Sequence, residues 1–151
     1  MTIFSPYRWK HNTMALSPQT LAQLAEHLET CQLQARDTPK ITDDHPQMDW
    51  DDAYAIQDAI LARKLARGAR VVGLKAGLTS HAKMKQMGVT EPVFGCLVDE
   101  YTVAEGATVD TSALIHPKVE PEIAFVLKHA LRGQAATSAR CWRPPTSCCP
   151  A

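Results

Sequence analysis

The first apolar residues of the chain recur at the spacing of an α-helix. Ser17 suits the cap of that helix, because its hydroxyl can accept a backbone hydrogen bond, and Pro18 suits the first turn. The pattern predicts an amphipathic helix over residues 18–35. Its apolar face carries Leu21, Leu24, Leu28 and Cys31.

A second helical pattern follows a segment with two prolines. That segment, residues 37–48, is predicted to be an extended loop. The helix begins near Asp49 and ends at Gly68, with Asp51 and Asp52 in the first turn, where acidic side chains favour the helix dipole. Its inward face carries Ala53, Ile56 and Ile60.

From residue 70 onward the pattern changes to short apolar runs bounded by glycine and proline. A brief helix is expected from Ser80 to Met87, capped by Thr79 or Ser80 and ended by Gly88. Two helices followed by several short strands predict an α+β fold. The strands are expected at residues 70–75, 93–98 and 119–127, with a hairpin or edge strand at 101–109.

The last of these strands carries two carboxylates. In an extended chain Glu120 and Glu122 share one face and lie roughly 6–7 Å apart. Two like charges on a strand with an apolar continuation need a counter-charge, and a hard divalent cation could bind one oxygen of each. The alternative is an edge strand with a solvated acidic face, where Pro121 is also tolerated. The spacing leaves both interpretations open.

A second candidate is the segment GLKAGLTS, residues 73–80. It places Lys75 in an apolar strand between glycines, directly before a helix cap. Backbone N–H groups at a helix start suit a carboxylate, and Lys75 would add a positive charge nearby. The alternative is a lysine that extends into solvent from an edge strand. The spacing differs from that of a phosphate-binding P-loop.

Composition narrows the function classes. The chain of 151 residues has 16 basic and 16 acidic side chains, a balance that argues against nucleic-acid binding and a membrane-surface role. No apolar run approaches the roughly 18–20 residues that a membrane span needs, and the first residues lack a signal-peptide pattern. We therefore expect a cytoplasmic location. Five cysteines without an export signal do not predict a disulfide framework.

Both ends differ from the body of the chain. Residues 1–14 are predicted to be a disordered leader, with Met14 as an alternative start. Residues 132–151 hold three of the five cysteines and no acid. Codons rebuilt across residue boundaries turn pairs such as Arg140-Cys141 into NTG, which encodes only Leu, Met or Val. We therefore interpret this tail as a disordered product of a shifted reading frame, which resequencing of the locus would test.

Three motifs taken together resemble one enzyme family. The runs VVGLKAGLTSHAKMKQMGV, EPVFGCLVDE and IHPKVEPEIAFVL look like those of 4-oxalocrotonate decarboxylases and 2-hydroxypenta-2,4-dienoate (2-oxopent-4-enoate) hydratases, within the fumarylacetoacetate hydrolase superfamily. The resemblance covers residues 15–131. It implies N-terminal helices followed by the first strands of a fumarylacetoacetate-hydrolase-like mixed β-sheet, truncated to the N-terminal part of the domain.

The resemblance also implies a reaction. It is the metal-dependent decarboxylation of 4-oxalocrotonate (2-oxohex-3-enedioate), a small 2-oxo-dicarboxylate, to 2-hydroxypenta-2,4-dienoate in the meta-cleavage degradation of aromatic compounds. A dienoate hydratase and an inactive fragment are the alternatives. The family further implies a homo-oligomer, with the hydratase as a partner.

The residue roles that the resemblance implies fall on the two candidate segments. Lys75 is expected to be catalytic. Glu120 and Glu122 are expected to be two of three carboxylate ligands of Mg²⁺ or Mn²⁺, with the third ligand absent from this chain. The turn that is expected to bind substrate consists of Gly77, Leu78, Thr79 and Ser80.

Overall fold

The structure is a computed structural model that describes residues 15–127. The predicted leader at 1–14 and the predicted shifted-frame tail at 132–151 lie outside the described residues. The chain divides into two units, one up to Pro117 and one from Lys118 onward. The first unit holds all the helices and strands of residues 15–127.

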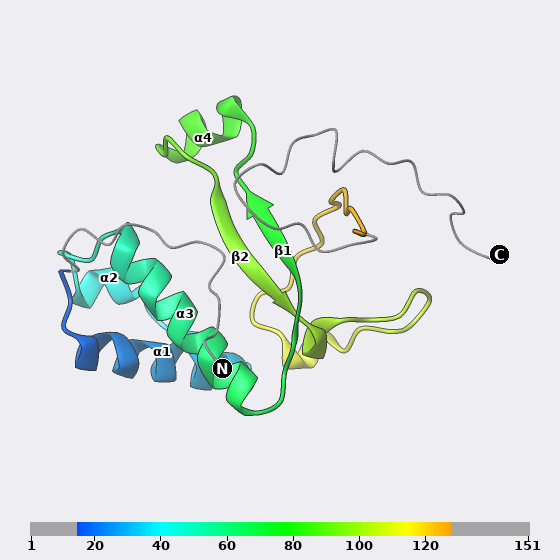
Figure 1. Cartoon of the computed structure of the whole chain (residues 1–151), viewed down its shortest axis with the longest axis horizontal. Helices are drawn as coiled ribbons and strands as arrows, with labels where there is room; N and C mark the ends of the chain where they lie inside the picture. Colours follow the sequence, from blue (N-terminus) through cyan, green and yellow to red (C-terminus); the bar gives the residue numbers. More distant parts are fainter. Residues whose placement is uncertain (1–14, 128–151) are drawn as a thin grey trace. The chain divides into compact units, whose positions relative to one another are not determined.

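Helix α1 (Pro18–Leu33) confirms the first predicted helix, although it ends two residues earlier than expected. The Ser17 hydroxyl accepts a hydrogen bond from the Thr20 N–H at 3.1 Å, which is the expected cap. Helix α1 packs along helix α3 (Trp50–Ala66), as Figure 1 shows. Their apolar faces form the core together with Leu16, which precedes α1, and the buried members of the core are Leu16, Leu21, Ala25 and Ile56.

Helix α3 begins and ends where the sequence predicts. Asp49 and Asp52 form a capping box, in which each carboxylate accepts a hydrogen bond from the other residue's backbone N–H. The fully buried Asp52 carboxylate also accepts from the Leu16 N–H at 3.2 Å. The N-terminus of α3 is thereby joined to the chain just before α1. Gly68 ends the helix with a φ of 100°, a conformation that glycine adopts readily.

The loop predicted at 37–48 is wrong in part, because it contains the single-turn helix α2 (Ile41–Asp44). The His45 N–H donates to the Ile41 carbonyl oxygen at 3.0 Å. Ile41 packs against the core between α1 and α3, so burial of this one apolar side chain favours the helical turn.

Two strands form the sheet of the described residues. Strands β1 (Val71–Gly77) and β2 (Val93–Val98) pair antiparallel, and helix α4 (His81–Met87) lies between them in sequence. Arg70 and Asp99 join the open end of the pair through a backbone hydrogen bond at 3.0 Å and an ion pair at 2.9 Å. These elements confirm the predicted strands at 70–75 and 93–98 and the predicted short helix, and β1 extends two residues further than expected.

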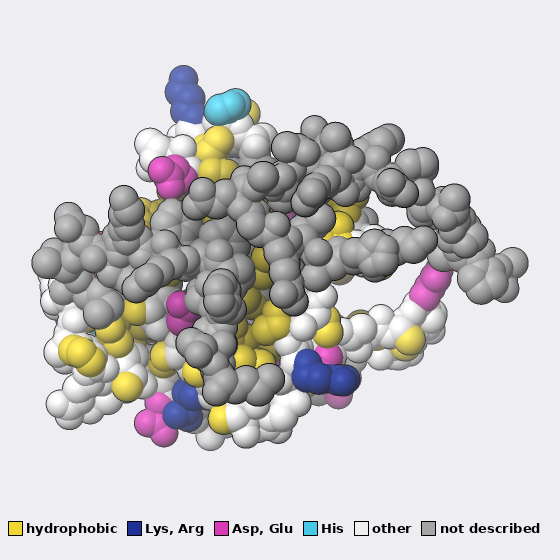
Figure 2. All heavy atoms as spheres, viewed as in Figure 1, with side chains coloured by type: hydrophobic (Ala, Val, Ile, Leu, Met, Phe, Trp, Pro, Cys, Tyr) yellow, Lys and Arg dark blue, Asp and Glu magenta, His cyan; other side chains and the backbone are white. Residues whose placement is uncertain are grey.

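Strand β1 leaves apolar side chains uncovered among the described residues. Val72 and Leu74 are 59% and 50% exposed. Figure 2 shows hydrophobic side chains at the surface on one face of the molecule. A sheet of two strands is marginally stable by itself, so this one depends on its contacts with the helices.

The hairpin or edge strand predicted at 101–109 is wrong. The short 3₁₀ helices η1 (Asp99–Tyr101) and η2 (Thr111–Ala113) flank a segment without a strand. Gly106 has a φ of 78°, and the Ala107 N–H donates to the Ala104 carbonyl oxygen across a turn. The alternating residues have no ladder partner in residues 15–127, and alternation alone does not form a strand.

The strand predicted at 119–127 is also wrong, as is its predicted burial. In the second unit, residues 118–127 have no regular secondary structure and are exposed. Val119 is 97% exposed and Phe125 is 81% exposed. A strand needs a hydrogen-bonded neighbour, and the ladder between β1 and β2 is the sole one in residues 15–127.

The described residues thus confirm the α+β fold class, with helices and a small antiparallel sheet. No helix among them combines the length and the apolar character that crossing a membrane requires.

Candidate active site

Lys75 lies in the middle of β1 and is exposed. It pairs with Gly95 of β2, and the next residue pairs along the ladder are Ala76 with Phe94 and Gly77 with Val93. Residues directly opposite each other in an antiparallel pair point to the same face of the sheet. Gly95 therefore contributes no side chain of its own to the face beside the lysine.

The predicted substrate-binding turn begins two residues after Lys75, at the end of β1. Gly77 ends β1, and the Ser80 hydroxyl caps α4 by accepting a hydrogen bond from the Lys83 N–H at 3.2 Å. Between them Leu78 has a φ of 55°, which a residue with a branched side chain rarely adopts. The structure thus brings Lys75 and the four turn residues into one continuous segment, with backbone strain at Leu78.

Gly77 allows the two strands to approach each other closely here. A Cβ atom on Gly77 would lie 3.1 Å from the Val93 Cγ2 atom, which is closer than ordinary carbon contacts. A side chain at this position would therefore crowd Val93 across the strand pair. This close approach fixes where the chain leaves β1 and enters the candidate binding turn.

Helix α3 supplies contacts to β2 that were not predicted. The Phe94 N–H donates a hydrogen bond to the Tyr54 hydroxyl at 3.2 Å. The Gln57 Oε1 atom lies 3.7 Å from the position that a Cβ atom on Gly95 would occupy. A tyrosine and a glutamine three residues apart on one helix face are the only sequence signal for these contacts, and that signal names no partner.

The predicted carboxylate pair belongs to the second unit. Glu120 and Glu122 are both exposed and lie in a segment without secondary structure. Exposure of these side chains is compatible with both a metal site and a solvated acidic face, so both interpretations of the pair stay predictions. The prediction that they sit on a buried strand is wrong, because that strand is absent.

The carboxylate groups of Glu120 and Glu122 are of the chemical type that binds a hard divalent cation. Carboxylate oxygens are the ligands that Mg²⁺ and Mn²⁺ prefer, and Glu120 and Glu122 can supply two of them. Residues 15–127 hold no group of three histidine, cysteine, aspartate or glutamate side chains arranged to bind a metal ion. The described residues therefore offer two ligands of the type that the family implies.

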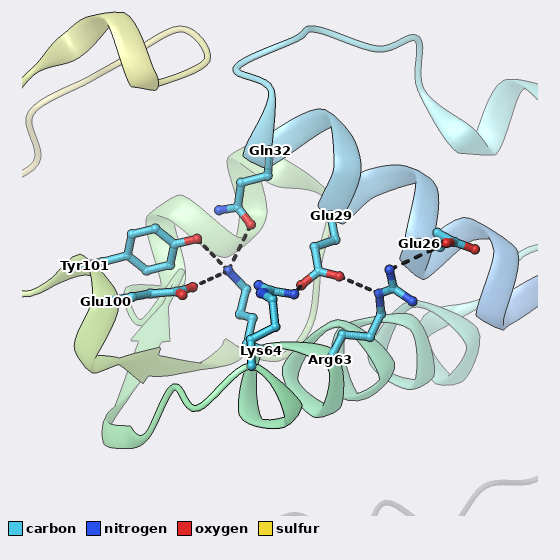
Figure 3. Close-up of polar contacts among 8 residues, drawn as sticks. Glu26, Glu29, Gln32, Arg63, Lys64, Glu100 and Tyr101 are labelled. Carbon is cyan, nitrogen blue, oxygen red and sulfur yellow. Dashed lines mark hydrogen bonds and ion pairs between the residues drawn. The ribbon is translucent and has the colours of Figure 1, made fainter.

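A polar network between α1, α3 and η1 was not predicted. Figure 3 shows the Lys64 ammonium donating to three oxygen atoms, those of Gln32 at 3.0 Å, Glu100 at 2.9 Å and Tyr101. The Lys64 nitrogen also lies 4.5 Å from the centre of the Tyr101 ring. Burial lowers the pKa of Lys64, but the hydrogen bonds to Tyr101 and Glu100 outweigh burial and raise it. The network thus attaches the segment after β2 to both helices.

Glu29 forms the other half of this network. Its carboxylate is 1% exposed and pairs with the guanidinium groups of Arg63 and Arg67 on α3. Burial acts to raise the pKa of Glu29, but the hydrogen bonds from the two arginines outweigh burial and lower it. The charged form is therefore favoured in the core.

Glu29 could have been found in the sequence. It lies four residues after Ala25, on the face of α1 that carries the apolar residues, so a buried charge with a partner was foreseeable. The basic last turn of α3 was a foreseeable partner for the same reason. The contacts of Lys64 with Glu100 and Tyr101 join residues that no local pattern relates.

The comparisons identify relatives of the same kind as the resemblance. The chain is 57% identical over 115 residues to a 4-oxalocrotonate decarboxylase from Pseudomonas sp. (strain CF600). It is 39% identical over 122 residues to a 2-keto-4-pentenoate hydratase from Paraburkholderia xenovorans (strain LB400). These matches cover 76% and 81% of this chain. No family model matches the chain.

A solved structure extends the similarity to the fold. The 4-oxalocrotonate decarboxylase from Pseudomonas putida G7, complexed with magnesium and adipate, matches with a TM-score of 0.66 and 48% identity. The match covers 68% of this chain and 39% of that one. The same enzyme complexed with calcium and acetate matches equally well.

The chain spans less than half the length of these relatives, 43% of the decarboxylase and 45% of the hydratase. Within that span the identity and the fold agree, so the resemblance is confirmed. Over the matched residues, this chain belongs to the enzyme family of the 4-oxalocrotonate decarboxylases and 2-keto-4-pentenoate hydratases.

Proposed function

We propose that this chain carries part of the active site of a metal-dependent 4-oxalocrotonate decarboxylase, a carboxy-lyase. The substrate would be 2-oxohex-3-enedioate, which loses its distal carboxylate as CO₂. The electrons released from that bond pass through the conjugated chain to the 2-oxo oxygen, and the product is 2-hydroxypenta-2,4-dienoate. A bound divalent cation would supply Lewis-acid stabilisation of the charge on that oxygen.

The chain's own residues would bind and orient the substrate. Lys75 would offset the negative charge of the substrate or assist proton transfer to the product. The turn from Gly77 to Ser80 would hold a substrate carboxylate beside it. Glu120 and Glu122 would supply two oxygen ligands to Mg²⁺ or Mn²⁺.

One observation carries the choice of decarboxylase. The chain is 57% and 52% identical to two 4-oxalocrotonate decarboxylases, and 39% identical to the 2-keto-4-pentenoate hydratase. A third decarboxylase is also 39% identical to the chain. The choice of decarboxylase over hydratase therefore rests on the two decarboxylases that are 57% and 52% identical to it. The magnesium and adipate complex of the P. putida G7 enzyme supports both a divalent metal and a six-carbon dicarboxylate.

Two alternatives remain distinct from this proposal. A hydratase would add water to 2-hydroxypenta-2,4-dienoate, and identities of up to 42% to hydratases favour it as the second candidate. The other alternative is an inactive fragment. It is favoured because residues 15–127 hold no group of three histidine, cysteine, aspartate or glutamate side chains arranged to bind a metal ion, and a site with few ligands binds Mg²⁺ weakly.

The proposal extends to the assembled protein. A homo-oligomer in the cytoplasm, associated with the hydratase, is the form that the family resemblance favours. A fumarylacetoacetate-hydrolase-like mixed sheet, of which β1 and β2 would be the first strands, is the fold that we propose for the whole domain.

Calorimetric titration of the purified chain with Mn²⁺ alone, and then with adipate in the presence of Mg²⁺, tests the proposal. We expect weak binding of Mn²⁺ that Glu120→Gln and Glu122→Gln each abolish and that Glu105→Gln leaves unchanged. We expect Lys75→Met to abolish adipate binding, and Lys83→Met, which removes an exposed lysine from α4, to leave it unchanged.

Turnover assays with the two candidate substrates then distinguish the decarboxylase, the hydratase and the inactive fragment. Metal-dependent loss of the ultraviolet absorbance of 2-oxohex-3-enedioate with release of CO₂ supports the decarboxylase. Consumption of 2-hydroxypenta-2,4-dienoate without CO₂ overturns it in favour of the hydratase. Absence of Mn²⁺ binding together with absence of turnover overturns both and leaves the inactive fragment.

A further inference from the structure

Three residues of helix α3 lie near three successive residues of β2, and one of them makes a hydrogen bond to it. Tyr54 accepts the hydrogen bond from the Phe94 N–H, and Gln57 lies against Gly95. Asp58 and Cys96 are the next residues along α3 and β2. The pKa of the Cys96 thiol is raised mainly by burial and, to a smaller extent, by the negative charge of Asp58. The three helix residues have the spacing i, i+3 and i+4, which places them on one face of α3.

The register of the sheet places the β2 residues near α3 directly opposite Lys75 and its neighbour in β1. Phe94 pairs with Ala76, and Gly95 pairs with Lys75. A side chain on Gly95 would point toward Gln57, and paired residues point to one face of the sheet. The Gln57 amide therefore lies on the face of the sheet to which Lys75 also points.

We infer that Tyr54 and Gln57 are positioning residues of the proposed active site, which hold β2 in place against α3 and thereby fix the strand that carries Lys75. This inference rests on the proposed function, because it assigns a purpose to a fixed position of that lysine. Neither residue is required to contact substrate. Both act through β2, and Tyr54 acts through a backbone hydrogen bond that phenylalanine cannot make.

The other end of the strand pair has a separate attachment. Arg70, which precedes β1, pairs with Asp99, which follows β2, and Lys64 binds Glu100 and Tyr101. This attachment contains a tyrosine and a glutamine of its own, Tyr101 and Gln32, which both contact the Lys64 ammonium. They provide matched controls, because their loss removes the same chemical groups at the end of the ladder away from Gly77.

The experiment follows the NMR signal and titration of the Lys75 side chain in the full chain with ¹³C- and ¹⁵N-labelled lysine. The signal is assigned from its loss in Lys75→Arg. We expect Tyr54→Phe and Gln57→Met to shift the Lys75 signal and its titration midpoint, whereas Tyr101→Phe and Gln32→Met leave both unchanged. Amide exchange at Phe94 should become roughly fivefold faster in Tyr54→Phe, as expected from the loss of one hydrogen bond.

Unfolding free energies of all four variants separate positioning from stability. A Lys75 signal that is unchanged in Tyr54→Phe and Gln57→Met overturns the inference. A signal that shifts in all four variants in proportion to lost stability also overturns it, because the effect would then be general. This measurement needs neither metal nor substrate, so its result does not depend on the proposed function. The proposed function is contradicted by a different result, namely adipate binding that stays intact in Lys75→Met.

Discussion

Glu29 is a charged residue at a position of α1 that faces the core. Its carboxylate is almost fully buried, while the side chains of its partners Arg63 and Arg67 are 42% and 41% exposed. Removal of one partner from a buried ion pair is costly because the other charges remain in the core. The exposure of both arginines lowers that cost, since water can solvate them when the carboxylate is gone.

We therefore expect Glu29→Gln to lower the free energy of unfolding by about 2 kcal/mol. The control is Glu26→Gln, since Glu26 is 66% exposed and lies 3.7 Å from Arg63. An exposed pair of this kind contributes less than about 0.5 kcal/mol. Urea unfolding at neutral pH measures both variants, and an equal loss in the two would contradict the assignment of the buried charge.

Ala35 has a conformation that favours glycine. Its φ is 48°, and the backbone hydrogen bonds from Ala35 and Arg36 to Gln32 and Cys31 close the end of α1 in a Schellman motif. At the end of α3 the same motif has Gly68 in the equivalent position. The two helix ends thus differ mainly in the side chain at one left-handed residue.

Ala35→Gly should raise the free energy of unfolding by about 0.5 kcal/mol, because relief of the left-handed strain exceeds the entropy cost of glycine. Gly68→Ala should lower it by about 1 kcal/mol. Thermal unfolding followed by circular dichroism measures both. If Ala35→Gly destabilises the chain as a glycine inside a helix does, the strain at Ala35 is smaller than the backbone angle implies.

At the scale of elements, local signals predicted helices α1, α3 and α4 and the turn of the candidate site, whereas α2 was not predicted. Ser17 caps α1 as predicted, and Ser80 caps α4, for which Thr79 or Ser80 was predicted. Asp49, near which the second helix was predicted to begin, is the cap of α3, and Gly88 ends α4 with a φ of 70°. The segment from Lys75 to Ser80 was also placed correctly, because a strand that ends in glycine before a cap is a local pattern. Each of these interactions joins residues that are close in sequence.

Strands and the polar network were harder to predict for the same physical reason. The segments at 101–109 and 119–127 alternate like strands but have no ladder partner among the described residues. The contacts of Lys64 and Tyr54 join residues 32 to 40 positions apart. Such contacts depend on how elements pack, and hydrophobic spacing within one element does not determine that.

The close pairing at Gly77 makes the strand pair sensitive to a single methyl group. Gly77→Ala should lower the free energy of unfolding by about 1 kcal/mol, because a Cβ atom would lie 3.1 Å from Val93. Gly73→Ala is the control, since its Cβ atom would meet Leu97 at an ordinary 3.5 Å. Hydrogen exchange of the β1 and β2 amides measures both variants, and equal protection in the two would contradict the steric argument.

At the scale of the molecule, the buried charges set how stability depends on pH. The folded pKa of Glu29 is lowered from its ordinary value of 4.5, so its contribution is complete above that pH and is lost as pH falls through the folded pKa. The folded pKa of Lys64 is raised from 10.5, so its contribution is present below that pH and is lost as pH rises through the folded pKa.

We expect the free energy of unfolding to fall steeply as pH drops below about 4.5. Glu29→Gln should flatten this acid decline, since the variant no longer takes up that proton on unfolding. Urea unfolding at a series of pH values from neutral to acid measures the slopes. Parallel slopes in the two proteins would show that other carboxylates cause the acid decline.

Several apolar side chains of the second unit are exposed to solvent among the described residues. Val119, Ile123 and Phe125 are 97%, 86% and 81% exposed. A contiguous apolar segment with an unpaired backbone favours contact with other chains, through burial of the side chains and through strand pairing. The isolated chain should therefore self-associate through these residues.

Sedimentation velocity over a range of concentrations measures this association. We expect the apparent mass of the wild-type chain to rise with concentration, and the double variant Ile123→Lys/Phe125→Lys to remain monomeric over the same range. Val103→Lys adds a charge at a residue of the first unit that is 51% exposed, and it should associate like the wild type. If the double variant associates as strongly as the wild type, the contact lies elsewhere, and the uncovered face of β1 with Val72 and Leu74 becomes the surface to test.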